Sequence, residues 1–293
     1  MALFTVLLAL GLVQFWGSGA PLHRDDWFHW WCGRLFGRGE LQGHPERMLA
    51  VAVLPPVVAA AILMVLVEAA LGGLGALLLG ALLLLYCLGR GNFNEMVSSY
   101  LRNWYQGDLE AARKAAAPLL RELPEAPADE PQVLHEQVFR GAAYCAFERL
   151  FAVLFWFLLL GIPGAVMYRL SALYADAAPE GGNRETAMRW LWLLEWLPVR
   201  AMGFSFAIVG NFAGCYRAWR QCLTCRERST PEVLEIYLEG ALGGIDASEC
   251  SAGVEVAEGQ RACGAQLEGL QALLSRALLL WITVLALLVL FDF

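Results

Sequence analysis

The sequence predicts an all-α, polytopic membrane protein with about five or six membrane helices, some broken by Gly or Pro, plus cytosolic helical loops. Apolar residues make up 58% of the 293 residues, and the mean hydropathy is +0.52. Several long runs exclude charged residues, which is typical of integral membrane proteins rather than soluble domains. We therefore interpret residues 1–293 as a single integral membrane domain.

Four runs are apolar and long enough for a bilayer crossing, which takes ~20 residues. They are residues 48–67, 71–88, 150–170 and 275–291. A fifth run, 2–16, is short for a crossing, which leaves open that it is tilted, partly buried in protein or re-entrant. It has no basic start and no small-residue cleavage site, so we interpret it as a retained membrane element.

A sixth run, 190–212, is apolar but contains Glu195, Pro198 and Arg200. The sequence leaves open whether this run crosses the bilayer. Pro198 has no N–H, and its ring clashes with the preceding helical turn, so we predict a freed backbone carbonyl near Leu194.

The distribution of basic residues predicts the sidedness of the loops, because Lys and Arg favour the cytoplasmic side of short loops. If all six runs cross, sixteen Lys and Arg residues fall on one side, in segments 16–47, 89–149 and 213–274. The other side holds Arg169, Arg184 and Arg189. We therefore predict that 89–149 and 213–274 are cytosolic loops, with 213–274 changing sides if 190–212 does not cross.

The first of these loops is expected to contain a helical hairpin. Apolar residues recur at helical spacing from Phe93 to Trp104 and again from Leu109 onward, which gives each segment one apolar face. Gly107 and Asp108 break and recap the chain between the two segments.

Charged residues in and beside the apolar runs form the candidate ligand-binding set, which is Glu148, Arg169, Glu195 and Arg200. A charge near the bilayer centre costs on the order of 3 kcal/mol or more, so it persists where it has a partner or faces a polar cavity. These side chains could bind an anionic head group or another polar ligand. An equally weighted alternative is structural, with Arg149 and Arg169 reaching the membrane interface and Glu195 in an ion pair.

Two of the runs also carry a family resemblance. Phe155-Trp156 is followed by a Gly-rich turn and Tyr168-Arg169, and Trp196-x-Pro198-x-Arg200 comes later. Together with the opening Met1-Ala-Leu-Phe-Thr-Val-Leu-Leu, these segments resemble the AmpE family, whose relatives include the CobD/CbiB membrane enzymes of cobalamin biosynthesis.

The resemblance to CobD/CbiB implies acidic motifs around the Phe-Trp run that would hold Mg-nucleotide or activate an acid. The corresponding segments here contain few carboxylates. They read Tyr144-Cys-Ala-Phe-Glu148, Ser171-Ala-Leu-Tyr-Ala-Asp176 and Leu191-Trp192. Because most of the acidic set is replaced, the sequence favours the AmpE side of the relationship. We therefore predict no catalytic residues.

The remaining motifs predict neither a metal nor a cofactor. Cys222-x-x-Cys225, with Cys250 and Cys263 downstream, leaves open a zinc site or a redox pair, but the segment lacks a knuckle turn and cytosolic thiols are usually reduced. Lys114 is the only lysine, so the chain has no G-x-x-x-x-G-K-[ST] loop for a nucleotide. A net charge of -7 disfavours a nucleic-acid partner.

We therefore expect a multi-pass protein of the cell inner membrane that contacts membrane lipid and acts as a regulator or sensor. The AmpE resemblance implies association with β-lactamase induction and peptidoglycan recycling, and suggests the cytosolic anhydro-muropeptide amidase of that pathway as a partner. The alternatives are a CobD-like amide-forming or nucleotide-using enzyme, and a small-molecule transporter. We find no internal repeat in the sequence that would favour a transporter. The ligand and the oligomeric state are left open.

Overall fold

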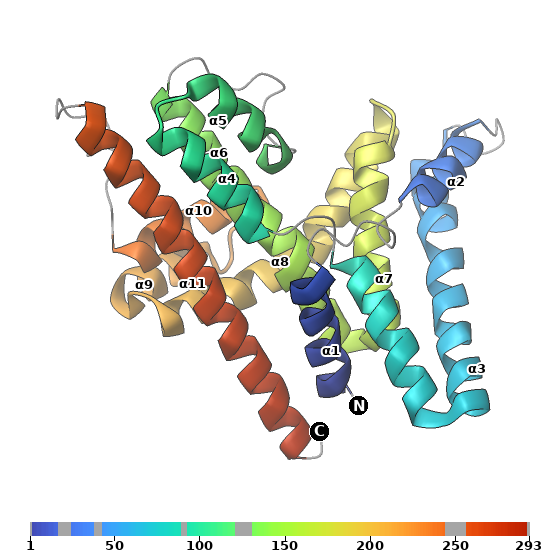
Figure 1. Cartoon of the computed structure of the whole chain (residues 1–293). Helices are drawn as coiled ribbons and strands as arrows, with labels where there is room; N and C mark the ends of the chain where they lie inside the picture. Colours follow the sequence, from blue (N-terminus) through green and yellow to red (C-terminus); the bar gives the residue numbers. More distant parts are fainter. Residues whose placement is uncertain are drawn as a thin grey trace. The chain divides into compact units, whose positions relative to one another are not determined.

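The computed structural model describes residues 2–16, 25–37, 43–88, 93–120, 131–243 and 256–291. All regular secondary structure in these residues is helical (Figure 1). The helices long and apolar enough to cross a membrane are Pro45–Cys87, Val133–Ala177, Gly182–Val209 and Cys263–Leu290, and Leu3–Val13 is a shorter apolar helix. The predicted all-α, polytopic fold is confirmed.

The chain divides into two compact units. Unit 1 comprises Met1–Arg90, Arg149–Pro198 and Leu285–Phe293, and unit 2 comprises Gly91–Glu148 and Val199–Val284. The helices of unit 1 are α1 (Ala2–Trp16), α2 (Asp26–Phe36), α3 (Pro45–Cys87), α7 (Ala152–Ala177) and the first part of α8 (Gly182–Val209). Those of unit 2 are α4 (Phe93–Tyr105), α5 (Leu109–Ala116), α6 (Pro131–Ala146), α9 (Phe212–Cys222), α10 (Thr230–Leu242) and most of α11 (Val256–Leu290). The single-domain interpretation of the sequence stays a prediction beside this division.

α3 is a helical hairpin. Its arms, 45–71 and 73–87, meet at Gly72, whose φ of 68° and ψ of -166° are not helical. Glycine adopts such a backbone readily because it has no Cβ. The reversal brings Gly75 against the first arm, since a Cβ on Gly75 would lie 2.5 Å from the Cβ of Leu71. In Figure 1 the second arm turns back at the tip and diverges from the first, and the two arms coincide closely with the predicted runs 48–67 and 71–88.

α7 reverses in the same way at Gly161, which has a φ of 67° and a ψ of -152°. A Cβ on Gly164 would collide with the carbonyl oxygen of Trp156 and would lie 2.6 Å from the Cβ of Leu160. The returning arm, 162–177, therefore touches the backbone of the preceding one. The run 150–170, which the sequence predicts as one crossing, contains this reversal.

The two reversals share a short sequence motif, although the sequence shows no internal repeat that pairs its two halves. The shared segments are Leu71-Gly72-x-x-Gly75-Ala76 and Leu160-Gly161-x-x-Gly164-Ala165. Their first glycines have matching dihedral angles, and their second glycines make the same close approach. α3 and α7 also pack against each other. Unit 1 is thus built around a pair of glycine-tipped hairpins.

The two predicted cytosolic loops, 89–149 and 213–274, pack together in unit 2. α6 lies against α10, with Arg140 Nη2 2.8 Å from Glu235 Oε2. The Tyr105 hydroxyl of α4 donates to Glu268 Oε1 of α11 at 2.9 Å. Arg140 and Glu268 lie on helices that are long and apolar enough to cross a membrane, so the side on which the two loops lie stays a prediction.

The predicted break between the first two loop helices is confirmed. Gly107 has a φ of 74°, which suits glycine. The Asp108 side chain caps α5 by accepting a hydrogen bond from the backbone N–H of Ala111 at 3.0 Å. Such a cap satisfies one of the N–H groups that a helix start leaves unpaired.

Candidate functional site

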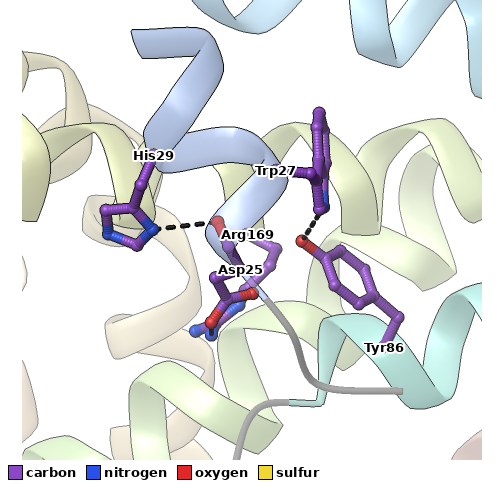
Figure 2. A network of polar contacts seen from close by, with 5 residues as sticks. All are labelled: Asp25, Trp27, His29, Tyr86 and Arg169. Carbon is purple, nitrogen blue, oxygen red and sulfur yellow. Dashed lines mark hydrogen bonds and ion pairs between the residues drawn. The ribbon is translucent and has the colours of Figure 1, made fainter. Parts of the chain in front are cut away.

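Arg169 lies on the returning arm of α7 and exposes 4% of its surface. Its Nη2 atom is 3.2 Å from Oδ2 of Asp25, the residue before α2 (Figure 2). Asp25 occupies the N-cap position of α2, but its side chain does not cap that helix. The carboxylate instead neutralises the arginine. Removing one partner of a buried pair leaves an uncompensated charge, which is strongly destabilising.

Contacts around Asp25 anchor α2 to both arms of α3. Trp27 Nε1 donates to the Tyr86 hydroxyl of the returning arm at 3.1 Å, and His29 Nδ1 lies 2.9 Å from the carbonyl oxygen of Asp25 (Figure 2). Trp31 Nε1 donates to a backbone carbonyl of the first arm at 3.3 Å. Asp25 is therefore presented to α7 by a helix that is fixed on α3.

Glu195 of α8 is also buried, with 2% of its surface exposed. Its Oε1 atom accepts a hydrogen bond from the Tyr168 hydroxyl at 3.0 Å. Tyr168 directly precedes Arg169 in the chain. Two successive residues of α7 thus engage acidic side chains from α8 and from the start of α2.

The carbonyl that Pro198 frees is that of Leu194, as predicted. In a regular helix this oxygen would accept the N–H of residue 198, which proline lacks. Trp156 Nε1 donates to it at 3.1 Å. Nearer the start of α8, Trp190 Nε1 donates to the Ser171 hydroxyl of α7 at 3.0 Å. Polar contacts therefore join α7 to α8 at several levels.

Arg200 lies in unit 2 and has a different environment. Its guanidinium donates to the backbone carbonyls of Cys222, Leu223 and Cys225 at 3.3, 3.4 and 2.6 Å. Cys222 is the last residue of α9. The final carbonyls of a helix lack N–H partners and carry the negative end of the helix dipole. Arg200 therefore caps the C-terminus of α9.

Glu148 lies in a π-helix, Phe147–Phe151, that joins α6 to α7, and it exposes 6% of its surface. Single π-helical turns are rare and are frequent at functional sites. Glu148 and Arg200 belong to unit 2, whereas Arg169 and Glu195 belong to unit 1. The geometry connects Arg169 and Glu195 through the neighbouring Tyr168, and a single site of all four residues stays a prediction.

Sequence reasoning missed Asp25, and it cited Tyr168 only as part of a motif. A buried arginine in a membrane protein needs a partner, which is an acidic side chain or a group of backbone carbonyls. Asp25, however, is 144 positions away from Arg169, and the chain has 28 acidic residues to choose from. For Tyr168 a signal was present, because the Tyr168-Arg169 pair belongs to the segment that resembles the AmpE family.

Burial changes the pKa values of cysteine thiols in unit 2. Burial raises the pKa of Cys222, and it raises the pKa of Cys215 to about 11; a raised pKa disfavours the thiolate that binds metals. Among the described residues, no group of three or more His, Cys, Asp or Glu side chains is placed to hold a metal ion. Cys263 is disulfide-bonded, which corrects the expectation of reduced thiols at that position. Cys250 lies outside the described residues.

Comparison with known families gives a match that includes all of unit 1 up to Pro198. Residues 1–239 match the family described as "Regulatory signalling modulator protein AmpE". The chain belongs to the AmpE family. The matched residues contain both hairpins, the Arg169 and Glu195 contacts and the Arg200 cap.

Two curated relatives of this AmpE-family chain are each named "Cobalamin biosynthesis protein CobD". The protein from Chromobacterium violaceum is 34% identical over 126 residues, which cover 39% of this chain and 38% of the relative. The protein from Stutzerimonas stutzeri is 30% identical over 196 residues, which cover 63% of this chain and 59% of the relative. The chain thus spans less than two thirds of the length of either relative. No solved structure matches the chain.

Proposed function

We propose that this protein is an inner-membrane regulator or sensor associated with β-lactamase induction and peptidoglycan recycling, and that it is a non-catalytic relative of the CobD/CbiB enzymes. The observation that carries the proposal is the polar cluster on α7, where Tyr168 and Arg169 engage groups on two other helices. Contacts of this kind hold helices together and can be exchanged for a ligand. The signalling description of the AmpE family supports the same role.

Sensing at this cluster would work by competition. An anionic ligand that reaches Arg169 competes with Asp25, and a ligand that donates a hydrogen bond to Glu195 competes with Tyr168. Either exchange releases one helix, α2 or α8, from the returning arm of α7. A ligand shifts such an equilibrium by the difference between its binding free energies for the two states.

The proposal extends to Glu148 and Arg200 because their chain segments continue the same helices. The π-helix that contains Glu148 leads directly into α7, and Arg200 follows Pro198 on α8. A shift of α7 or α8 would then alter the helices of unit 2. Most of these helices belong to the predicted cytosolic loops, 89–149 and 213–274. We propose that the anhydro-muropeptide amidase docks on these loops.

The test uses an inducible β-lactamase strain in which the chromosomal gene carries single substitutions. We expect Arg169→Ala and Arg200→Ala to alter induction by a β-lactam. The matched controls are Arg184→Ala on the exposed start of α8 and Arg226→Ala in the second loop, and these should leave induction unchanged.

Membrane abundance of each variant is measured in the same cells, because loss of protein would imitate loss of signalling. The double variant Asp25→Arg, Arg169→Asp keeps an ion pair but exchanges the positions of its positive and negative charges. Normal induction by an Arg169→Ala protein that accumulates normally would refute the sensing role of the cluster.

The CobD relatives favour a membrane enzyme as the second candidate, since both carry a cobalamin biosynthesis name. The test is expression of this chain in a strain that lacks its own CobD, on a medium where growth requires cobalamin synthesis. Restored growth would establish the enzymatic candidate. We expect no restoration, because most of the acidic motif positions of the CobD relatives hold other residues here.

The paired hairpins at Gly72 and Gly161 favour transport as a further candidate. Repeated apolar helices that are broken by Gly or Pro are a common pointer to the binding site of a transporter. Uptake of a radiolabelled anhydro-muropeptide by membrane vesicles with and without this protein tests that candidate. Protein-dependent accumulation would favour transport over sensing.

A further inference from the structure

Unit 1 contains a pocket of about 470 Å³ between α3, α7 and α8, a size typical of small-molecule sites. Its walls are one face of the first arm of α3 and one face of the first part of α8, and Met167 of α7 contributes between them. The pocket does not contain any of the four predicted ligand residues. It is therefore a separate feature of the protein.

The lining of this pocket changes from polar to apolar along its length. Glu46, Thr186 and Arg189 line it near the starts of α3 and α8, and Val53, Leu54 and Leu193 line it further along both helices. Figure 1 shows α3 and α8 both beginning at the upper end of unit 1. Glu46 and Leu54 are eight positions apart, which corresponds to about 12 Å along a helix.

The apolar end of the pocket opens outward. Leu54 and Leu193 are 54% and 58% exposed, although both lie on helices apolar enough to cross a membrane. In a bilayer such positions contact acyl chains. At the pocket wall, the Trp190 ring is held by its hydrogen bond to Ser171, so this side of the pocket is preformed.

The polar end presents two opposite charges that are not paired with each other. Glu46 and Arg189 are exposed, and neither forms an ion pair or hydrogen bond with the described residues. An unpaired guanidinium suits a phosphate, and an unpaired carboxylate suits a primary ammonium group. A ligand that carries both groups, close together and joined to an apolar chain, matches this arrangement.

We propose that this pocket binds a phospholipid with an ethanolamine head group. The phosphate binds Arg189 and the Thr186 hydroxyl, and the ammonium group binds Glu46. The beginning of one acyl chain packs on Val53, Leu54 and Leu193, and the rest of the lipid leaves through the open apolar end. Phosphatidylglycerol lacks the cation that Glu46 requires, and the quaternary ammonium of phosphatidylcholine cannot donate a hydrogen bond to the carboxylate.

The test is native mass spectrometry of the full-length protein in detergent, with phosphatidylethanolamine, phosphatidylglycerol or phosphatidylcholine of identical acyl chains. We expect retention of phosphatidylethanolamine about fivefold above the other two, as one extra hydrogen bond from the ammonium group to Glu46 provides. Glu46→Gln should remove this preference without reducing retention of phosphatidylglycerol. Arg189→Gln should weaken retention of both phosphatidylethanolamine and phosphatidylglycerol.

Arg184→Gln is the matched control, because Arg184 is an exposed arginine of α8 outside the pocket lining. Melting temperatures of all variants verify that the substitutions at these exposed positions leave the fold intact. Equal retention of the three lipids, stronger retention of phosphatidylglycerol, an unchanged preference in Glu46→Gln or unchanged retention in Arg189→Gln would overturn the proposal. None of these results bears on β-lactamase induction, so the lipid site and the sensing role fail separately.

Discussion

The two hairpins of unit 1 share a turn but differ in what their arms carry. Each reverses at a glycine with a φ near the same positive value, 68° at Gly72 and 67° at Gly161. Around the first tip, large apolar residues such as Leu66 and Leu74 are 60% and 76% exposed. Residues 168–175 of the returning arm of α7, in contrast, are all buried.

Aligning the hairpins on their shared segment shows where they diverge. Leu79, Gly80 and Leu82 of α3 correspond to Tyr168, Arg169 and Ser171 of α7. Polar side chains thus occupy the buried stretch 168–175 of the returning arm of α7, and apolar residues occupy the corresponding arm of α3, which is buried only in part. The difference follows from solvation, because lipid offers no hydrogen-bond partner and a neighbouring helix does.

The hairpins should also differ in how they cross the membrane, which is the largest effect that we expect. If the loops 89–149 and 213–274 lie on the same side of the membrane, the chain crosses the membrane an even number of times between residues 149 and 213. The reversal at Gly161 satisfies this within α7 if α8 does not cross the bilayer, and Glu180, in the turn before α8, should then share the side of both loops. Labels at Glu180, Glu125 and Glu255 should then give the same accessibility.

A label at Glu68, near the tip of α3, provides the internal comparison. The first arm of α3, 45–71, is long enough to cross at about 1.5 Å per residue, so Glu68 should label from the opposite side. If Glu180 labels with Glu68 and not with the loops, α7 crosses the bilayer despite its glycine break.

Replacing the arginine that distinguishes the second hairpin should be costly. We expect Arg169→Leu to lower the free energy of unfolding by about 3–5 kcal/mol, because the buried Asp25 carboxylate loses its partner. At the corresponding position of α3, a Cβ on Gly80 would meet Thr5 at an ordinary 3.4 Å, so Gly80→Ala should have little effect. Unfolding in detergent, followed by circular dichroism, measures both. Partial recovery in the double variant Asp25→Leu, Arg169→Leu would identify the loss of the ion pair as the cause.

The second glycine of each turn offers a matched pair with a smaller expected effect. Gly164→Ala should cost about 1–3 kcal/mol, because its Cβ meets the backbone oxygen of Trp156 in a buried arm. The Cβ of Gly75→Ala meets the side chains of Leu71 and Val67 instead. Its arm is exposed there and can move away from the first arm of α3. Comparison of their melting temperatures tests this order, and an equal loss in the two variants would contradict it.

The smallest effect concerns the aromatic hydroxyls of the two returning arms. Tyr168→Phe removes the hydrogen bond to buried Glu195 and should cost about 1 kcal/mol. Tyr86→Phe removes an exposed hydrogen bond to Trp27, which water can replace, so its loss should be smaller. Denaturant titration resolves the two variants, and a larger loss for Tyr86→Phe would reverse the assignment of the polar hairpin.

The sequence by itself determined the class of the fold and much of its local structure. Apolar run length predicted the membrane helices, and the missing N–H of Pro198 predicted the free carbonyl of Leu194. The helix break at Gly107 and the cap at Asp108 followed from the same local chemistry. These features depend on residues within about one helical turn of each other, so they can be derived from a single chain.

Only the tertiary structure decided the reversals at Gly72 and Gly161 and the partners of the buried charges. Glycine permits a positive φ but does not require it, so an apolar run with glycine can cross straight or fold back. The pairing of Arg169 with Asp25, and of Arg200 with the end of α9, depends on packing between distant segments. Helix packing brings those groups together, and no local pattern in the sequence encodes which of many acids or carbonyls will be nearest.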